Sequence, residues 1–132
     1  MADTVTPQGI VAVARQSPSS LKDVFAGEPR LIAICEEVRD PGNLGTIIRA
    51  ADAAGADAVV LTGRTVDPYN PKVVRATTGS LFHVPVAVGA DLASVVERAH
   101  AAGLRVIAAD VGGDDFLARR NLLAEPTAWL FG

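Results

Sequence analysis

From residue 31 onward, the chain alternates short apolar runs with segments in which apolar residues recur at helical spacing. A strand buried on both faces has a continuous apolar run, because neither of its faces meets water. Largely apolar runs of strand length occupy residues 31–35, 58–61, 84–88, 105–109 and 128–131. The pattern therefore predicts five strands. A further apolar run at 10–14 predicts an edge strand.

The segments between these runs predict helices. After a turn expected at residues 40–45, a helix is predicted to run to about Ala54, with Gly55 at its C-terminal cap. Its apolar stripe consists of Leu44, Ile47, Ile48 and Ala51. Shorter helices are expected from Ser20, as the capping residue, to residue 25, and at 73–77 and 116–123. Another follows Asp91 and ends before Gly103.

Strands that alternate with helices over short connections are typical of an α/β fold with a mostly parallel sheet. The length of 132 residues is enough for one domain with a modest core. Apart from the run at 10–14, the first 18 residues are polar and irregular. We interpret residues 1–18 as a linker or entry segment and 19–132 as a single domain.

Composition and charge exclude several classes of protein. With 49% hydrophobic and 20% charged residues, the chain is expected to fold, and no apolar run approaches the ~20 residues of a membrane helix. One cysteine, Cys35, excludes an internal disulfide framework and is interpreted as a buried core thiol. No secretory signal is apparent, so we expect a cytoplasmic protein. The net charge of −3 argues against a strong general nucleic-acid binder, which would be basic.

The candidate chemistry lies in and after the segment 40–45. Its glycines allow close backbone approach, Asn43 is expected to cap the following helix, and a helix N-terminus attracts anions. On spacing alone, an ordinary turn with a good cap is the favoured alternative. Arg49 lies off the apolar stripe, on the side shared with Gly45 and Asp52. Its guanidinium could bind phosphate or polarise a hydroxyl, or it could simply pair with Asp52 in solvent, which the residues alone favour.

The segment 70–80 combines Lys72 and Arg75 with small hydroxyl residues and Gly79, so it could hold a polar ligand through its backbone. The alternative is a surface loop with a short helix, and composition does not decide between them. His83 and His100 lie too far apart, without a third ligand, to suggest zinc. We place His83 in a loop or at a strand edge and His100 on a helix surface.

Taken in order, these segments resemble the motifs of the SpoU (TrmH) family. Residues 40–51, DPGNLGTIIRAA, resemble the first motif; residues 74–86, VRATTGSLFHVPV, the second; and residues 129–132, WLFG, the opening of the third. Residues 6–10, TPQGI, match the usual entry to the catalytic domain. In the second motif the family usually has Ser followed by Gly-Ala, where this chain has Thr78 and then Gly79-Ser80.

The resemblance implies an RNA ribose 2′-O-methyltransferase of the SPOUT superfamily, with a Rossmann-like core and S-adenosyl-L-methionine as cofactor. It implies that Arg49 is the catalytic residue, which engages the target nucleotide and helps to activate its 2′-hydroxyl, and that Asn43 supports it. It further implies that Thr78, Gly79 and Gly132 contact the cofactor. The expected substrate is ribosomal RNA, with transfer RNA as the alternative, and the full-length protein is expected to be a homodimer.

Family members continue into a C-terminal trefoil knot, and many carry an N-terminal RNA-binding domain, neither of which is in this sequence. We therefore expect an N-terminal portion of a methyltransferase, inactive alone, with weak or no cofactor binding and with one sheet face short of cover. The rival from another class is a non-catalytic SPOUT-like module for dimerisation or RNA docking. Arg49 favours the enzyme, because a pure interaction module has no need of it. A generic nucleotide-binding domain ranks last, since no phosphate fingerprint is present.

Overall fold

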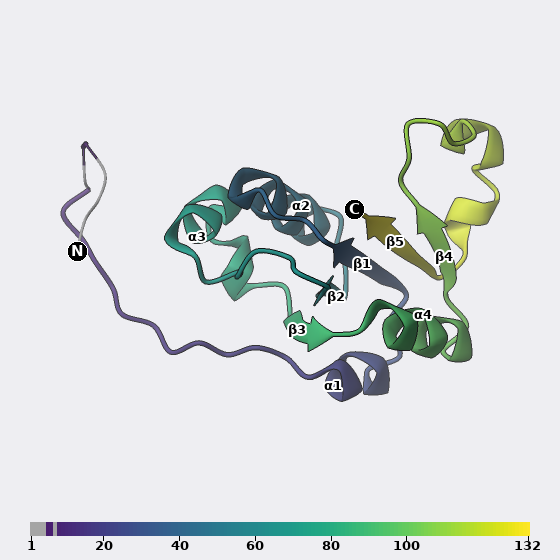
Figure 1. Cartoon of the computed structure of the whole chain (residues 1–132), viewed down its shortest axis with the longest axis horizontal. Coiled ribbons are helices and arrows are strands. Elements are labelled where there is room, and N and C mark those ends of the chain that lie inside the picture. Colours follow the sequence, from purple (N-terminus) through teal and green to yellow (C-terminus); the bar gives the residue numbers. More distant parts are fainter. Residues whose placement is uncertain (1–4, 7) are drawn as a thin grey trace.

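Five parallel strands form the centre of the protein, in the order β3-β2-β1-β5-β4 (Figure 1). The structure is a computed structural model that describes residues 5–6 and 8–132, so residues 1–4 and 7 of the expected linker lie outside the described residues. Every pairing in the sheet is parallel, which confirms the α/β prediction. The strands are β1 (Leu31–Glu36), β2 (Ala58–Thr62), β3 (Val86–Ala90), β4 (Arg105–Ala108) and β5 (Thr127–Phe131).

Helices cover both faces of the sheet. On one face lie α2 (Pro41–Ala53) and α3 (Pro71–Thr77), and on the other lie α1 (Leu21–Ala26) and α4 (Leu92–Ala101). Because successive strand residues point to opposite faces, Ala33 and Cys35 of β1 pack toward α2, whereas Ile32 and Ile34 pack toward α1 and α4. The continuous apolar run of β1 is thus explained by two separate cores.

Helix α2 begins earlier than the sequence pattern predicts. Pro41 is its first residue, and the carboxylate of Asp40 accepts a hydrogen bond from the Asn43 backbone N–H at 2.8 Å. The predicted turn at 40–45 and the predicted capping role of Asn43 are therefore wrong. Proline suits the first helical position, where no N–H is needed, and aspartate is a preferred capping residue. At the other end Gly55 has a φ of +74°, as its predicted place at the cap requires.

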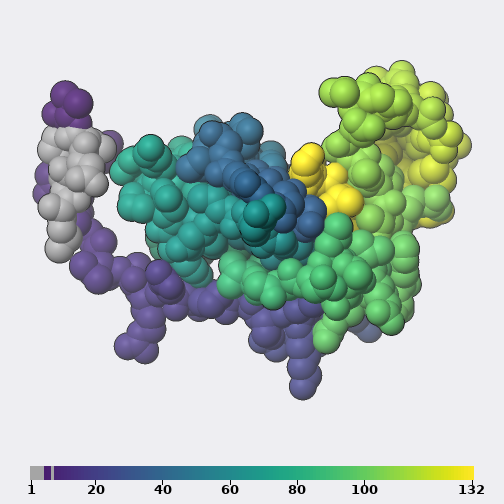
Figure 2. Space-filling model, in the orientation of Figure 1, coloured from purple at the N-terminus to yellow at the C-terminus, as the bar shows by residue number. Residues whose placement is uncertain are grey.

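The predicted edge strand at 10–14 is also wrong. These residues form no strand, and Ile10 and Val13 are each 87% exposed on an extended arm that precedes α1 (Figures 1 and 2). The arm touches the sheet at Ser19, which is bridged in parallel to Ala87 of the edge strand β3. Continued in that register, residues 10–14 would lie opposite 78–82, a turn and a 3₁₀ segment that offer no extended partner.

Two smaller differences concern strand and helix boundaries. β3 begins at Val86, two residues later than predicted. The helix expected at 116–123 is replaced by two short 3₁₀ turns, η2 (Phe116–Arg119) and η3 (Leu122–Ala124). In the part of the chain that the structure describes, no helix is both long and apolar enough to cross a membrane.

One sheet face is only partly covered, as expected. Trp129 of β5 lies directly between Ala33 of β1 and Ile107 of β4 in register, so all three point to the α2 face. Helix α2 covers β1 and β2, but the segment 109–124 stands beyond β4, and a hollow separates it from α2 (Figure 2). Half-buried Trp129 and Phe131 line this uncovered part of the sheet.

Burial predicts the reactivity of the single cysteine. Cys35 is fully buried in β1, and this burial raises the pKa of its thiol to about 12. We expect the native protein at pH 8.5 to resist iodoacetamide and the urea-unfolded protein to react rapidly, as read by mass spectrometry. Because the raised pKa belongs to the folded state, stability is expected to fall as the pH rises from 9.0 toward 12. Equal labelling of native and unfolded protein would contradict this burial.

Candidate active site

Helix α2 presents different residues to its two sides. Residues that are three, four or seven positions apart share one side of a helix. Gly45, Arg49 and Asp52 therefore lie on one side, which faces α3 and the 3₁₀ segment η1 (Ser80–Phe82). Asn43 lies in line with Ile47 on another side, which faces β5. The predicted position of Arg49 beside Gly45 and Asp52 is confirmed.

The α3 side of α2 is fixed by a contact at each end. A side-chain Cβ placed on Gly45 would lie 2.3 Å from the Cβ of Ala76, so the missing side chain lets α2 and α3 touch. Seven residues along α2, the Asp52 carboxylate lies 3.4 Å from Nδ1 of His83, which directly follows η1. Arg49 lies between these two contacts along α2, on the side of the helix that faces α3 and η1.

The expected Arg49–Asp52 ion pair is not formed. Asp52 contacts His83 instead, and within the described residues Arg49 has no carboxylate within 4.0 Å. Arg49 is also exposed. Arg49 is thus a cation without an ion-pair partner in the described chain, on the side of α2 that faces α3 and η1.

The turn beside Arg49 has an unusual backbone. Thr78 ends α3 with a φ of +49° and a ψ of +40°, in the left-handed region, and Gly79 follows with a φ of +97°. Both residues are exposed, and no heavy atom lies within 4 Å of the place where a Cβ on Gly79 would be. The space above this turn is therefore open to a ligand. Lys72 and Arg75 are exposed on α3, whose N-terminus is capped by Asn70.

Backbone strain at Thr78 leads to a stability prediction. A β-branched residue in the left-handed region costs about 1 kcal/mol, and glycine relieves this cost. We expect Thr78→Gly to raise the free energy of unfolding by about 0.5–1 kcal/mol in urea titrations. The matched variant Thr46→Gly, in the regular helix α2, should lower it by about 0.5 kcal/mol. A loss of stability in both variants would contradict the strain at Thr78.

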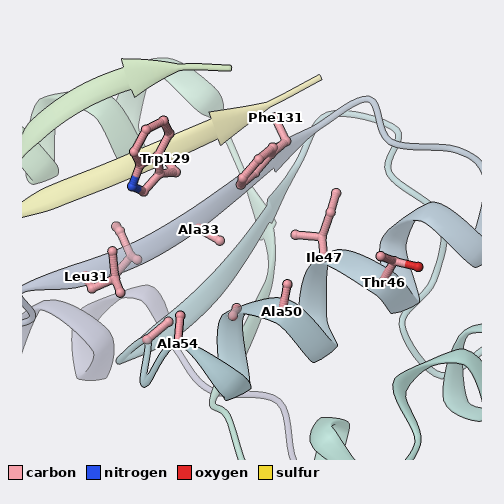
Figure 3. Close-up of a pocket in the computed structure, with 11 residues that line it drawn as sticks. Leu31, Ala33, Thr46, Ile47, Ala50, Ala54, Trp129 and Phe131 are labelled. Atoms are coloured by element: carbon pink, nitrogen blue, oxygen red, sulfur yellow. The ribbon is translucent and has the colours of Figure 1, made fainter. Parts of the chain in front are cut away.

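The β5 side of α2 borders an apolar hollow of about 310 Å³. Trp129 and Phe131 of β5 and Ile47 and Ala50 of α2 point into the same space (Figure 3). The lining is almost entirely apolar and contains no charged side chain. Asn43 is exposed on the N-terminal turn of the same side of α2.

Gly132 lies at the end of β5, next to the end of β1. A Cβ on Gly132 would lie 2.9 Å from the backbone oxygen of Glu36, so this position leaves no room for a side chain. Helix α2 stands between α3 and the end of β5 (Figure 1). The structure therefore groups Arg49 with Thr78 and Gly79 on one side of α2. It places Asn43 and Gly132 on the other side.

Other cations near the ends of β1 and β2 are neutralised. The Glu37 carboxylate accepts hydrogen bonds from the Arg39 guanidinium at 2.9 Å and from the Arg64 backbone N–H at 3.0 Å. These two contacts, with the bond from Arg39 foremost, hold the pKa of the Glu37 carboxyl below its usual value. Arg49 differs from Arg39 and Arg64 in having no such carboxylate among the residues that the structure describes. No cluster of three metal-ligating side chains occurs in the described ranges.

Sequence reasoning missed the contact of His83 with Asp52. A histidine before a strand carries no signal of its partner 31 residues away, which only the packing of η1 against α2 reveals. It also missed the contact between Gly45 and Ala76, although glycine inside a helical pattern is a hint of close packing.

Known proteins are similar to this chain over most of its length. Residues 30–132 match the model of the SpoU rRNA Methylase family. The 23S rRNA (guanosine(2553)-2'-O)-methyltransferase RlmP of Bacillus subtilis (strain 168) is 45% identical over 104 residues, which are 79% of this chain and 40% of that protein. The 23S rRNA (uridine(2479)-2'-O)-methyltransferase of Streptomyces viridochromogenes is 37% identical over 112 residues, which are 83% of this chain and 38% of that protein.

The fold has close solved counterparts. A crystal structure of an AdoMet-bound rRNA methyltransferase from Sinorhizobium meliloti superposes on 87% of this chain and 44% of its own, with a TM-score of 0.76 and 40% sequence identity. The chain spans 40% and 38% of the length of the two curated relatives named above, and as little as 20% of another, the rRNA methyltransferase 3A, mitochondrial, of Danio rerio.

Proposed function

The chain belongs to the SpoU rRNA Methylase family, and we propose that it serves to methylate the ribose 2′-hydroxyl of ribosomal RNA with S-adenosyl-L-methionine as donor. The observation that carries this proposal is Arg49, which has no ion-pair partner among the described residues and lies on the side of α2 that faces α3 and the open turn after it. The two relatives described above are named as 23S rRNA 2′-O-methyltransferases, which supports RNA as the substrate.

In this proposal Arg49 binds the RNA and neutralises negative charge on it, and it does not act as the base that removes a proton. A guanidinium stays charged at any physiological pH, so it is a poor base, but its N–H groups can hold a phosphate and stabilise negative charge that develops on the 2′-oxygen. Fixing the nucleotide in this way also orients its hydroxyl. The exposure of Arg49 leaves the guanidinium free to meet a polyanion from solvent. Asn43 would support the site from the other side of α2.

S-adenosyl-L-methionine would supply an activated methyl group. Thr78, Gly79 and Gly132 would hold it, and the open space above Gly79 fits a ligand that approaches the backbone there. Gly132 lies on the other side of α2 from that turn, so the three residues do not form one cradle within this chain. We therefore assign no step of the reaction to their contacts with the cofactor.

A second candidate function is that of a non-catalytic module for dimerisation or RNA docking. The apolar hollow between α2 and β5 favours it, because half-buried aromatic residues on an incompletely covered sheet suit an interface.

A homodimer is compatible with either function and is part of our proposal. We also propose residues 1–18 as a linker, since the described part of that segment forms no helix or strand. The cytoplasmic location stays a prediction.

Methyl transfer in vitro tests the proposal and separates the candidates. Protein purified from its source cells would be incubated with tritiated S-adenosyl-L-methionine and either ribosomal RNA or transfer RNA from cells that lack the gene. We expect label in ribosomal RNA, on a ribose. Label in transfer RNA alone would contradict the substrate class. RNA binding without any transfer would support the non-catalytic module instead.

A further inference from the structure

We propose that His83 is a positioning residue that keeps the guanidinium of Arg49 available by holding the carboxylate of Asp52. This inference rests on the proposed function of Arg49, and it concerns how the chain prevents that arginine from being neutralised within its own helix. The observation behind it is the contact between His83 Nδ1 and the Asp52 carboxylate at 3.4 Å.

Arg49 and Asp52 are placed to pair with each other. They lie three positions apart on the same side of α2, and opposite charges at this spacing attract one another across a helix surface. The Asp52 side chain is 29% exposed, so it is held partly within the contact between α2 and η1. Its partner in the described structure is His83, and no ion pair joins it to Arg49.

The backbone around His83 fixes the approach of its imidazole ring. The His83 N–H donates to the Ser80 carbonyl at 3.0 Å, and the neighbouring Val84 and Leu81 are buried in the core beneath α2 and α3. The segment that carries His83 is thus anchored on both sides, although the ring itself is largely exposed. His83 consequently reaches Asp52 from the segment after η1, which lies outside α2.

This arrangement leaves the positive charge of Arg49 without a neutralising carboxylate in the described chain. Gly45 is packed against Ala76 at one end of the side that faces α3, and Asp52 is engaged by His83 at the other end. Between them Arg49 has no carboxylate within 4.0 Å among the described residues, and it lies on the side of α2 that faces α3 and η1. Without His83, the Asp52 carboxylate would be free to compete with an RNA phosphate for the guanidinium.

The test uses a set of variants in the natural-length protein. In His83→Leu the contact is lost, and we expect KM for ribosomal RNA to rise about twofold with kcat little changed, the size of one helical ion pair. In His83→Leu combined with Asp52→Asn the competing charge is gone, and we expect KM to return to the parent value. His83→Gln, which can still donate to Asp52, should behave like the parent and guards against a general folding defect.

Arg49→Ala provides the background in which the proposal is checked. If His83 acts through Arg49, adding His83→Leu to Arg49→Ala should change nothing further, because effects through one residue are not additive. The proposal is overturned if His83→Leu leaves KM unchanged, or if Asp52→Asn fails to restore it, since His83 would then contact RNA itself or serve packing alone. Full activity of Arg49→Ala would instead overturn the proposed function, whatever His83 does.

Discussion

Replacing Arg49 by alanine should lower the rate of methyl transfer to ribosomal RNA by about 100-fold or more. Removing one preorganised donor that stabilises developing negative charge typically costs this much in kcat. The structure strengthens the expectation, because Arg49 has no ion pair within the described chain and is exposed. The measurement is the initial rate of tritium transfer from S-adenosyl-L-methionine, with a calorimetric check that cofactor affinity is unchanged.

Two variants control for this result. Arg98 is exposed on α4, which covers the opposite face of the sheet, so Arg98→Ala removes the same charge far from the proposed site and should keep the parental rate. Arg49→Lys keeps the charge but loses the planar fork of donors, and we expect a partial loss. Equal activity of Arg49→Ala and Arg98→Ala would contradict a role for Arg49 in methyl transfer.

Placing a methyl group on Gly45 should destabilise the domain by about 2–3 kcal/mol, a cost at the upper end for overpacking. In Gly45→Ala the new Cβ would lie 2.3 Å from the Cβ of Ala76 and 3.0 Å from its carbonyl carbon, so α2 and α3 must move apart. The core beneath them, including Leu44 and Val73, would loosen with that movement. Urea unfolding monitored by circular dichroism measures the loss.

The close contact also predicts a partial rescue. Adding Ala76→Gly to Gly45→Ala removes the atom that the new methyl group meets first, so part of the stability should return. Gly42 lies in the same helix, where a Cβ would meet only the flexible Asp40 side chain at 3.2 Å, so Gly42→Ala should change stability by less than about 1 kcal/mol. If Gly45→Ala were as mild as Gly42→Ala, the helices would not be in contact at this point.

The strands could be read from the sequence because burial on both faces leaves a continuous apolar signal. β1 and β2 were predicted to within one residue for this reason. The start of α2 was misplaced because glycine and asparagine in its first turn resemble a loop, whereas the structure uses Asp40 and Pro41 to begin the helix there. The apolar run at 10–14 has the composition of a strand, yet a strand needs a neighbour in register, and residues 78–82 cannot provide one.

The site was predictable only in part. The position of Arg49 beside Gly45 and Asp52 follows from the helical repeat alone. The helical repeat does not predict that Asp52 contacts His83 and not Arg49, because this contact depends on how η1 packs against α2. The five candidate residues lie in motifs that follow one another in the chain. The order of the motifs does not predict that these residues lie on two different sides of α2, because that arrangement depends on how the elements pack.

The most direct test is a map of ribose methylation in cells. The chromosomal codon for Arg49 would be changed to alanine, with Arg98→Ala as the matched strain, and 2′-O-methyl positions in ribosomal and transfer RNA would be compared by mass spectrometry. We expect that a ribose in ribosomal RNA loses its methyl group in the Arg49→Ala strain and in a strain lacking the gene, but keeps it in the Arg98→Ala strain. An unchanged map in the strain that lacks the gene would contradict the proposed methyltransferase function.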